Sequence, residues 1–287
     1  MKIALLLMTL LILPAAAATA DTVPNQFELV AVKFTGVESV SESELAKTLA
    51  AQTPPIWKVW QPSPVLSAED LEEDQLRIQQ FYRNNGYYQT EVEIAVTVSG
   101  AEPDRKAEKA NGRDSASAEP AESPSETLPR VKVTYEITEG PPVLIESIDM
   151  AITGTIKGVD RTALLADTRL EIGQVFKVTE YEEAKTNITR TLGNRGYPFA
   201  EVTGHAVIDP AVNQAKLSFR TSPGPLSVFG PTTIDQEGTE VSETVIRRAL
   251  TYAEGDVYDA DKVETSRRNL FRLDVFRVAV IKPEGPP

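Results

Sequence analysis

The sequence contains no cysteine and only one histidine, His205, among its 287 residues. Without cysteine the chain can form no disulfide bond and carries no thiolate for catalysis or metal binding. A protein zinc site needs three or four side-chain ligands, most often cysteine and histidine, and this sequence does not offer that set. We therefore expect no metal and no cofactor.

The sequence also lacks a glycine-rich phosphate loop and a nucleophile elbow. Two acidic pairs, Glu72-Glu73 and Glu182-Glu183, could be interpreted as the carboxylates of a glycosidase. Each pair lies in the first turn of an expected helix, however, where acidic side chains interact favourably with the helix dipole. His205 is expected to point outward from a strand, as surface histidines do. We expect no catalytic residue and no enzymatic activity.

Positive charge is scarce, because 29 lysine and arginine residues stand against 42 acidic residues and give a net charge of −13. This charge argues against a nucleic-acid partner and against bulk attraction to anionic lipids.

Only one long hydrophobic run is present, the 11 residues 3–13, and it is too short to span a bilayer. Lys2 precedes it, and Ala18-Thr19-Ala20 follows as a small-x-small cleavage site. Residues 1–20 are therefore predicted to be a secretory signal peptide, with an uncleaved anchor as the alternative. No cysteine follows the site, so a lipoprotein anchor is excluded. The mature chain is expected to begin at Asp21 in an extracytoplasmic space.

The most informative feature is an internal repeat, since residues 71–92 recur as residues 181–202 with an offset of 110 and no gap. Eight of the 22 aligned positions are identical, including an Asn-x-Gly-Tyr motif at 84–87 and 194–197. Apolar residues at helical spacing predict a helix in each copy, and Gly86 or Gly196 is expected to end it in a left-handed conformation. Thr179 with Glu182, Ser41 with Glu44 and, more weakly, Ser67 with Asp70 predict capping boxes at helix starts.

After each glycine the hydrophobic period changes to two, which predicts strands at 88–98, 130–138, 200–208 and 214–221. The second pair is joined by a short turn at 209–213. The first pair is interrupted by residues 99–129, which are rich in Ala, Glu, Ser and Pro and almost without large aliphatic side chains. We interpret this segment as a disordered hairpin insertion rather than an interdomain linker.

The chain thus divides into a unit at 21–140, a second at 141–225 and a third at 226–287. Each follows the order strand, helix, helix, strand, strand, which predicts an α+β fold with a three-stranded mixed sheet and two helices on one face. The third unit has expected strands at 232–235 and 275–281 and helices from Ser242 and Asp259, but lacks its last strand. We therefore expect the natural protein to continue past Pro287.

This order, the Asn-x-Gly-Tyr helix endings, the Glu-Gly-Pro-Pro closure at 139–142 and the signal peptide resemble POTRA (polypeptide-transport-associated) domains. The resemblance covers residues 28–287. Three units with the pattern at 269–277 are most similar to those of TamA-like components of the translocation and assembly module. BamA-type and two-partner-secretion transporters share the unit in other numbers.

The resemblance implies that unfolded client polypeptides add a strand to the edge of the sheet at the second strand of each unit. These edges correspond to 88–98, 199–208 and 276–281, with the candidate binding residues Tyr88, Thr90, Val92, Phe199, Glu201, Thr203, His205, Phe276, Val278 and Val280. Gly86, Tyr87, Gly196 and Tyr197 are candidate structural residues. Whether Thr203 and Glu201 or Val202 and Gly204 direct their backbone groups to the free edge stays open at this point.

The resemblance further implies a periplasmic location with attachment to the outer membrane through a C-terminal β-barrel. The implied partners are unfolded outer-membrane polypeptides and an inner-membrane-anchored, TamB-like protein. Two alternatives are the periplasmic part of a two-partner-secretion transporter and a soluble periplasmic docking protein without clients.

Overall fold

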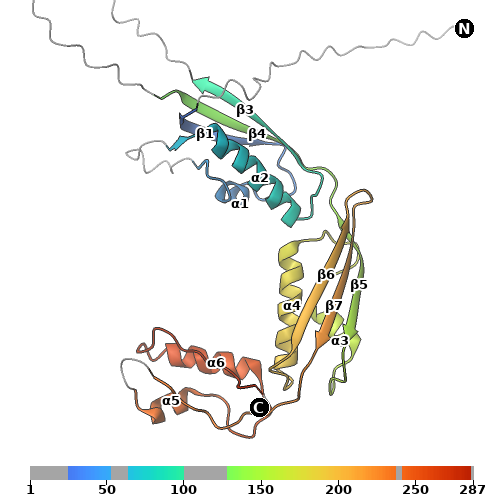
Figure 1. The fold of residues 1–287 in the computed structure, drawn as a ribbon, viewed down its shortest axis with the longest axis vertical. Helices are drawn as coiled ribbons and strands as arrows, with labels where there is room; N and C mark the ends of the chain where they lie inside the picture. The colour runs from blue at the N-terminus through green and yellow to red at the C-terminus, as the bar shows by residue number, and fades with distance from the viewer. Residues whose placement is uncertain (1–24, 53–63, 100–127, 237–240, 286–287) are drawn as a thin grey trace, which may run out of the picture. The chain divides into compact units, whose positions relative to one another are not determined.

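Figure 1 shows the computed structural model, which describes residues 25–52, 64–99, 128–236 and 241–285. The chain forms two compact units. The first contains residues up to 83 together with 89–140, and the second contains 84–88 together with the chain from 141 onward. Among the described residues, no helix combines the length and the hydropathy needed to cross a membrane.

The first unit is a four-stranded sheet covered on one face by two helices (Figure 1). Its strand order is β2 (Val65–Leu66), β1 (Phe27–Thr35), β4 (Arg130–Thr138) and β3 (Glu91–Ser99). Strand β4 pairs parallel with β1 and antiparallel with β3. Helices α1 (Glu42–Lys47) and α2 (Ala68–Asn84) bury Leu45, Ile78 and Tyr82, and β4 buries alternate residues from Val131 to Ile137.

The buried carboxylate of Asp74 organises part of the polar interior of the first unit. Asp74 is fully buried on the apolar face of α2 and accepts hydrogen bonds from the Ala50 and Ala51 backbone N–H groups at 2.8 and 2.9 Å. Arg77 donates to the same carboxylate at 2.6 Å, so the buried charge is paired. Burial, followed by the charge of Asp74, raises the pKa of the neighbouring Tyr135 hydroxyl. Asp74 therefore ties the chain after α1 to α2.

The second unit contains a three-stranded sheet in the order β5 (Leu144–Ile152), β7 (Gln214–Ser222) and β6 (Glu201–Asp209). Strand β7 pairs parallel with β5 and antiparallel with β6. Helices α3 (Arg161–Asp167) and α4 (Val178–Gly193) supply Leu164, Ile188 and Leu192 to a core that includes Ala215, Leu217 and Phe219 from β7. Buried and exposed residues alternate along β7, as the hydrophobic period of two at 214–221 predicts.

The α+β fold class is confirmed, and the predicted hairpin β3–β4 forms with continuous pairing from Glu91 with Thr138 to Ser99 with Arg130. Residues 100–127 of the expected insertion lie outside the described residues.

The capping predictions are partly wrong. Helix α4 begins after Lys177 rather than at Thr179 and has no side-chain cap, and Ser41 also makes no side-chain cap bond. The capping box at Ser67, which was expected to be the weaker one, does form. Ser67 and Asp70 exchange hydrogen bonds of 2.7 and 3.3 Å.

The last part of the second unit contains helices α5 (Glu243–Ala249) and α6 (Ala260–Phe271) but no assigned strand within 226–236 or 241–285. The prediction of strands at 232–235 and 275–281 is therefore wrong. A strand requires a hydrogen-bonded neighbour, and in the preceding repeat both equivalent strands pair with β7 rather than with each other. Phe276, Val278 and Val280 do not share one face, since Phe276 packs on the small core with Ala279 and Ile281 while Val278 and Val280 are exposed.

Candidate functional site: the open strand edges

Each of the two sheets has one edge covered by the chain itself. Strand β1 is flanked by β2, and the Leu29 N–H donates to the Pro64 carbonyl at 3.0 Å. Strand β5 exchanges hydrogen bonds of 2.8 and 2.9 Å with Gly173 and Gln174. The opposite edges, β3 and β6, have no strand neighbour among the described residues. These two edges present backbone groups to solvent and form the candidate site.

The direction of the backbone groups of β6 follows from the bonds of β7. Residues of β7 direct their N–H and C=O groups alternately to β5 and to β6. The Thr221 carbonyl accepts from Thr153 on the β5 side at 2.9 Å, so Arg220 and Ser218 face β6. Their partners in β6 are Thr203 and His205, whose backbone groups therefore face β7. The Ser218 hydroxyl also donates to the His205 carbonyl at 3.2 Å, in agreement with this assignment.

The backbone groups that face the open edge of β6 therefore belong to the other set of residues, which are Val202, Gly204, Ala206 and Ile208. This assignment decides the question that the sequence leaves open. Three of the predicted binding residues, Glu201, Thr203 and His205, therefore direct their backbone groups to β7, while their side chains are exposed.

The same reasoning applies to β3. The Pro129 carbonyl accepts from the Glu28 N–H at 2.9 Å, so alternate residues of β4 from Val131 onward face β1. Val92, Ile94, Val96 and Val98 then direct their backbone groups to the open edge of β3. This edge is partly closed at its first position, because the Gln75 side-chain amide donates to the Val92 carbonyl at 2.6 Å.

The β6 edge differs at the matching position, where the repeat places Lys185 instead of Gln75. Lys185 pairs with Glu182 at 2.7 Å and lies 5.1 Å from the centre of the Tyr181 ring. Gly204 has no room for a side chain, because a Cβ atom there would overlap the Tyr181 hydroxyl. That hydroxyl is buried and has no hydrogen-bond partner among the described residues, and burial raises the pKa of Tyr181.

Several predicted edge residues lie outside the strands. Tyr88 packs on the core of the second unit, Thr90 donates to the Glu139 carbonyl at 2.9 Å, and both precede β3. Phe199 precedes β6 in the same way. These two strands begin later than predicted because the residues after each glycine form a turn before pairing starts. Phe276, Val278 and Val280 belong to no strand.

The two repeated glycines have the positive φ values expected of them, +95° for Gly86 and +97° for Gly196. Each also bonds to the segment that opens the following repeat. The Gly86 carbonyl accepts from Val143 and the Gly196 carbonyl accepts from Ser227, both at 2.8 Å. Tyr197 is buried, and its hydroxyl accepts from the Lys157 N–H at 2.9 Å, while Tyr87 lies partly buried beside Gly86. The sequence predicts the helix ending but not this second role.

No cluster of three or more potential metal ligands occurs in the described parts of the chain. A model of the POTRA family, described as "surface antigen variable number repeat", matches residues 28–140, 148–224 and 232–287. The chain belongs to the POTRA family. In each complete repeat, the last strand lies between the two strands that precede it in the repeat unit. This is the strand order of the POTRA domains in this chain.

Solved structures similar to this POTRA chain include POTRA domains 3–5 of Haemophilus influenzae BamA. That structure is 20% identical, covers 89% of this chain and 90% of its own, and has a TM-score of 0.50. The N-terminal domain of Omp85 from Thermosynechococcus elongatus is 16% identical, with 88% of each chain covered and a TM-score of 0.35. CdiB from Escherichia coli is 13% identical over 73% of this chain and 29% of its own, with a TM-score of 0.30. At these identities the first match supports the fold.

Proposed function

We propose that this POTRA chain is a periplasmic scaffold that binds unfolded outer-membrane polypeptides by strand addition. The observation that carries this proposal is the open edge of β6, where the backbone groups of Val202, Gly204, Ala206 and Ile208 have no strand partner. An extended chain that aligns with this edge gains main-chain hydrogen bonds without a requirement for a particular sequence. Such tolerance suits a protein that handles many clients.

The side chains around β6 favour a client in extended conformation. Val202, Ala206 and Ile208 are partly buried against the core, while Glu201, Thr203 and His205 are exposed on the opposite face. A strand added to this edge would continue the same two-faced pattern, with apolar side chains towards α4 and polar side chains towards solvent. Strands of outer-membrane proteins alternate in this way.

The proposed setting rests on the sequence and the family. The signal peptide predicted at 1–20 would deliver the chain to the periplasm, and POTRA arrays occur in outer-membrane assembly and translocation systems. The resemblance to TamA-like proteins adds an inner-membrane-anchored, TamB-like partner and attachment to the outer membrane. The net charge of −13 leaves nucleic acid out of the proposed partners.

The test uses a photoreactive amino acid in place of Glu201 and an unfolded outer-membrane polypeptide as the probe. Ala206→Pro removes one N–H from the open edge without removing a bond to β7, and proline is tolerated on the outer side of an edge strand. We expect Ala206→Pro to lower the crosslinking yield at least tenfold, while the chain keeps its circular dichroism spectrum.

Two matched controls separate backbone from side-chain recognition. Ala206→Ser keeps the N–H, and His205→Ala removes an exposed side chain, so both should crosslink as the parent chain does. If the folded proline variant crosslinks normally, or if His205→Ala abolishes crosslinking, strand addition at β6 is the wrong mechanism.

A further inference from the structure

A tyrosine hydroxyl of the second repeat is buried beside the open edge of β6 without a partner. Tyr181 is only 6% exposed, and its hydroxyl makes no hydrogen bond with any described residue. It lies against Gly204 on the side of α4, since a Cβ atom at 204 would overlap it. Such a group is unfavourable in the free protein, because it has given up its hydrogen bonds to water and gained none. The edge proposed for strand addition therefore carries an unused hydrogen-bonding group.

The first repeat has a different arrangement at the same place. With the offset of 110 residues, Tyr181 corresponds to Leu71 and Gly204 corresponds to Ile94, so the hydroxyl and the bare backbone are both replaced by apolar side chains. The edge of β3 is instead partly closed by Gln75, whose side-chain amide donates to a carbonyl of that strand at 2.6 Å. The second repeat thus leaves its edge open and places a hydroxyl beside it.

The surroundings of this hydroxyl decide which partner fits it. The Tyr181 ring packs against Phe219 and Phe176, with ring centres 5.3 and 6.0 Å away. The Lys185 ammonium lies 5.1 Å from the ring centre and is paired with Glu182 at 2.7 Å. A charged partner of either sign would meet a like charge in this pair and would lose water against the apolar core. An uncharged hydrogen-bonding group avoids both costs.

A strand added to β6 brings one side chain within reach of this hydroxyl. Side chains directly opposite each other on neighbouring strands have Cβ atoms about 4.5–5.5 Å apart. The residue opposite Gly204 points towards α4, and the Tyr181 hydroxyl lies where the Cβ of residue 204 would be. A serine, threonine or asparagine at that position can therefore form a hydrogen bond with Tyr181. The neighbouring inward positions lie opposite Val202 and Ala206, which pack on the core.

We propose that Tyr181 sets the register of the strand that adds to β6. The added strand places an uncharged hydrogen-bonding side chain opposite Gly204 and apolar side chains at the two neighbouring inward positions. Backbone hydrogen bonds alone do not define this register, because a strand shifted by two residues forms the same bonds and keeps the same face inward. This inference rests on the proposed function and adds to it the class of client segment that the edge prefers.

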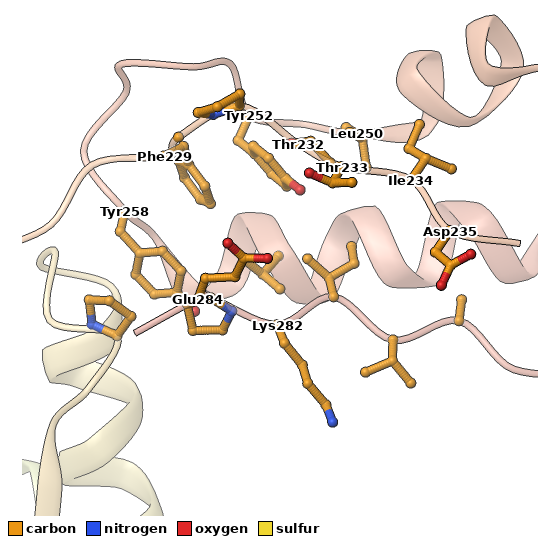
Figure 2. Close-up of a pocket in the computed structure, with 18 of the residues that line it drawn as sticks. Phe229, Thr232, Thr233, Ile234, Asp235, Leu250, Tyr252, Tyr258, Lys282 and Glu284 are labelled. Carbon is orange, nitrogen blue, oxygen red and sulfur yellow. The ribbon is translucent and has the colours of Figure 1, made fainter. Parts of the chain in front are cut away.

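Two tyrosines of the third repeat show what distinguishes Tyr181. Tyr252 and Tyr258 line an open groove of about 660 Å³, with ring centres 4.0 and 5.1 Å from that of Phe229 (Figure 2). Neither hydroxyl is a buried group without a partner in the described part of the chain. A tyrosine-to-phenylalanine change at 258 therefore removes a hydroxyl of the ordinary kind and is the matched control for the same change at 181.

The test compares two peptides as long as β6, nine residues, with alternating apolar and polar side chains. The central inward residue is threonine in one peptide and valine, which has the same shape, in the other. A central residue can lie opposite Gly204 whichever way the peptide runs. We expect the parent chain to bind the threonine peptide about fivefold more tightly, as one net hydrogen bond requires. Fluorescence anisotropy of labelled peptides measures both affinities.

Tyr181→Phe should lose this preference and should stay folded, because the hydroxyl that it removes bonds to nothing in the described chain. Tyr258→Phe should keep the preference. An equal preference for threonine in the parent and in Tyr181→Phe would overturn the role of the hydroxyl. If the parent binds both peptides equally and Ala206→Pro abolishes both, strand addition holds and the register proposal fails. Failure of the parent to bind either peptide would overturn both proposals.

Disulfide trapping reads the register directly, because the chain has no cysteine of its own. His205→Cys places a thiol on the exposed face of β6, next to Gly204, and each peptide carries one cysteine at an outward position. With the threonine peptide, the disulfide should form at one outward position beside the central residue, since the bond requires Cβ atoms about 3.5–4.5 Å apart. With the valine peptide, or with Tyr181→Phe added, the yield should spread over several positions. The same sharp yield with and without the Tyr181 hydroxyl would contradict the proposal.

Discussion

Gly196 shows two separate requirements for glycine at one residue. Its φ of +97° is a conformation that side chains rarely adopt, and a Cβ atom would come within 2.6 Å of Leu226 and 3.0 Å of Val257. Gly158 has a similar φ of +74° but no heavy atom within 4 Å of the same position. The two glycines therefore separate the conformational requirement from the packing requirement.

We expect Gly158→Ala to lower the free energy of unfolding by about 1 kcal/mol, from backbone strain alone. Gly196→Ala should lower it by about 2–3 kcal/mol, because the neighbouring side chains must also move. Urea denaturation of both variants measures the difference. Equal losses would mean that the segment after Gly196 adapts to a side chain at no cost.

Glu139 is a residue whose ionisation supports the first unit. Its carboxylate accepts hydrogen bonds from the Glu38 and Ser39 N–H groups at 2.8 and 3.0 Å and from the Tyr82 hydroxyl at 2.9 Å. Burial alone would raise the pKa of Glu139, but the hydrogen bonds from Ser39, Glu38 and Tyr82 outweigh it and hold the pKa below its ordinary value of 4.5. The ionised form is thus favoured by the folded state.

Because folding lowers the pKa of Glu139, its ionised carboxylate stabilises the fold at pH values above the ordinary pKa. This stabilisation is lost as the pH falls from about 4.5 towards the pKa of the folded state. Glu139→Gln should cost about 1 kcal/mol at pH 7, since one charged acceptor is lost. The gap in unfolding free energy between parent and variant should narrow below pH 4.5. A gap that stays constant from pH 7 to pH 3 would contradict the role of the charge.

At the scale of single elements, the positions of helices could be predicted from the local spacing of apolar residues. The spacing of Ile78 and Tyr82 in α2, and of Ile188 and Leu192 in α4, was sufficient to locate both helices. The cap of α4 could not be predicted in this way. The preceding residues Gly173 and Gln174 are bonded to β5, and this pairing brings the chain into the helix at Lys177, ahead of Thr179.

Properties that depend on a partner element were not predictable from local pattern. The residues of β6 that face the open edge follow from the pairing of β7 with β5, a contact about 70 residues apart in sequence. The alternating residues at 275–281 predict a strand, but no strand forms without a neighbour to complete the ladder. Asp74 was also missed, although a carboxylate in line with Leu71 and Ile78 on the apolar face of α2 is a signal for a buried, satisfied charge.

At the scale of the whole molecule, the two complete POTRA repeats differ in how their last two strands are joined. Asp209 pairs with Gln214 across a four-residue turn, whereas Ser99 pairs with Arg130 at the same position of the first repeat. The turn residue Asn213 offers its carbonyl to Leu144 at 2.9 Å, and Pro129 offers its carbonyl to Glu28 at the same distance. The short turn thus supplies the same backbone contact as the long connection.

Replacement of residues 100–129 by Pro-Ala-Val-Asn, the turn at 210–213, should therefore preserve the β3–β4 ladder. The entropy of closing a loop grows only slowly with its length, so a shorter loop should leave the free energy of unfolding unchanged or raise it by about 1 kcal/mol. Denaturant unfolding of the parent and shortened chains measures this. The control variant replaces 100–129 by 30 residues of glycine and serine and so keeps only the length of the loop. Its free energy of unfolding should match that of the parent chain. A loss of more than about 2 kcal/mol in both variants would exceed the loop-length term and show that residues 100–129 make contacts that stabilise the folded chain.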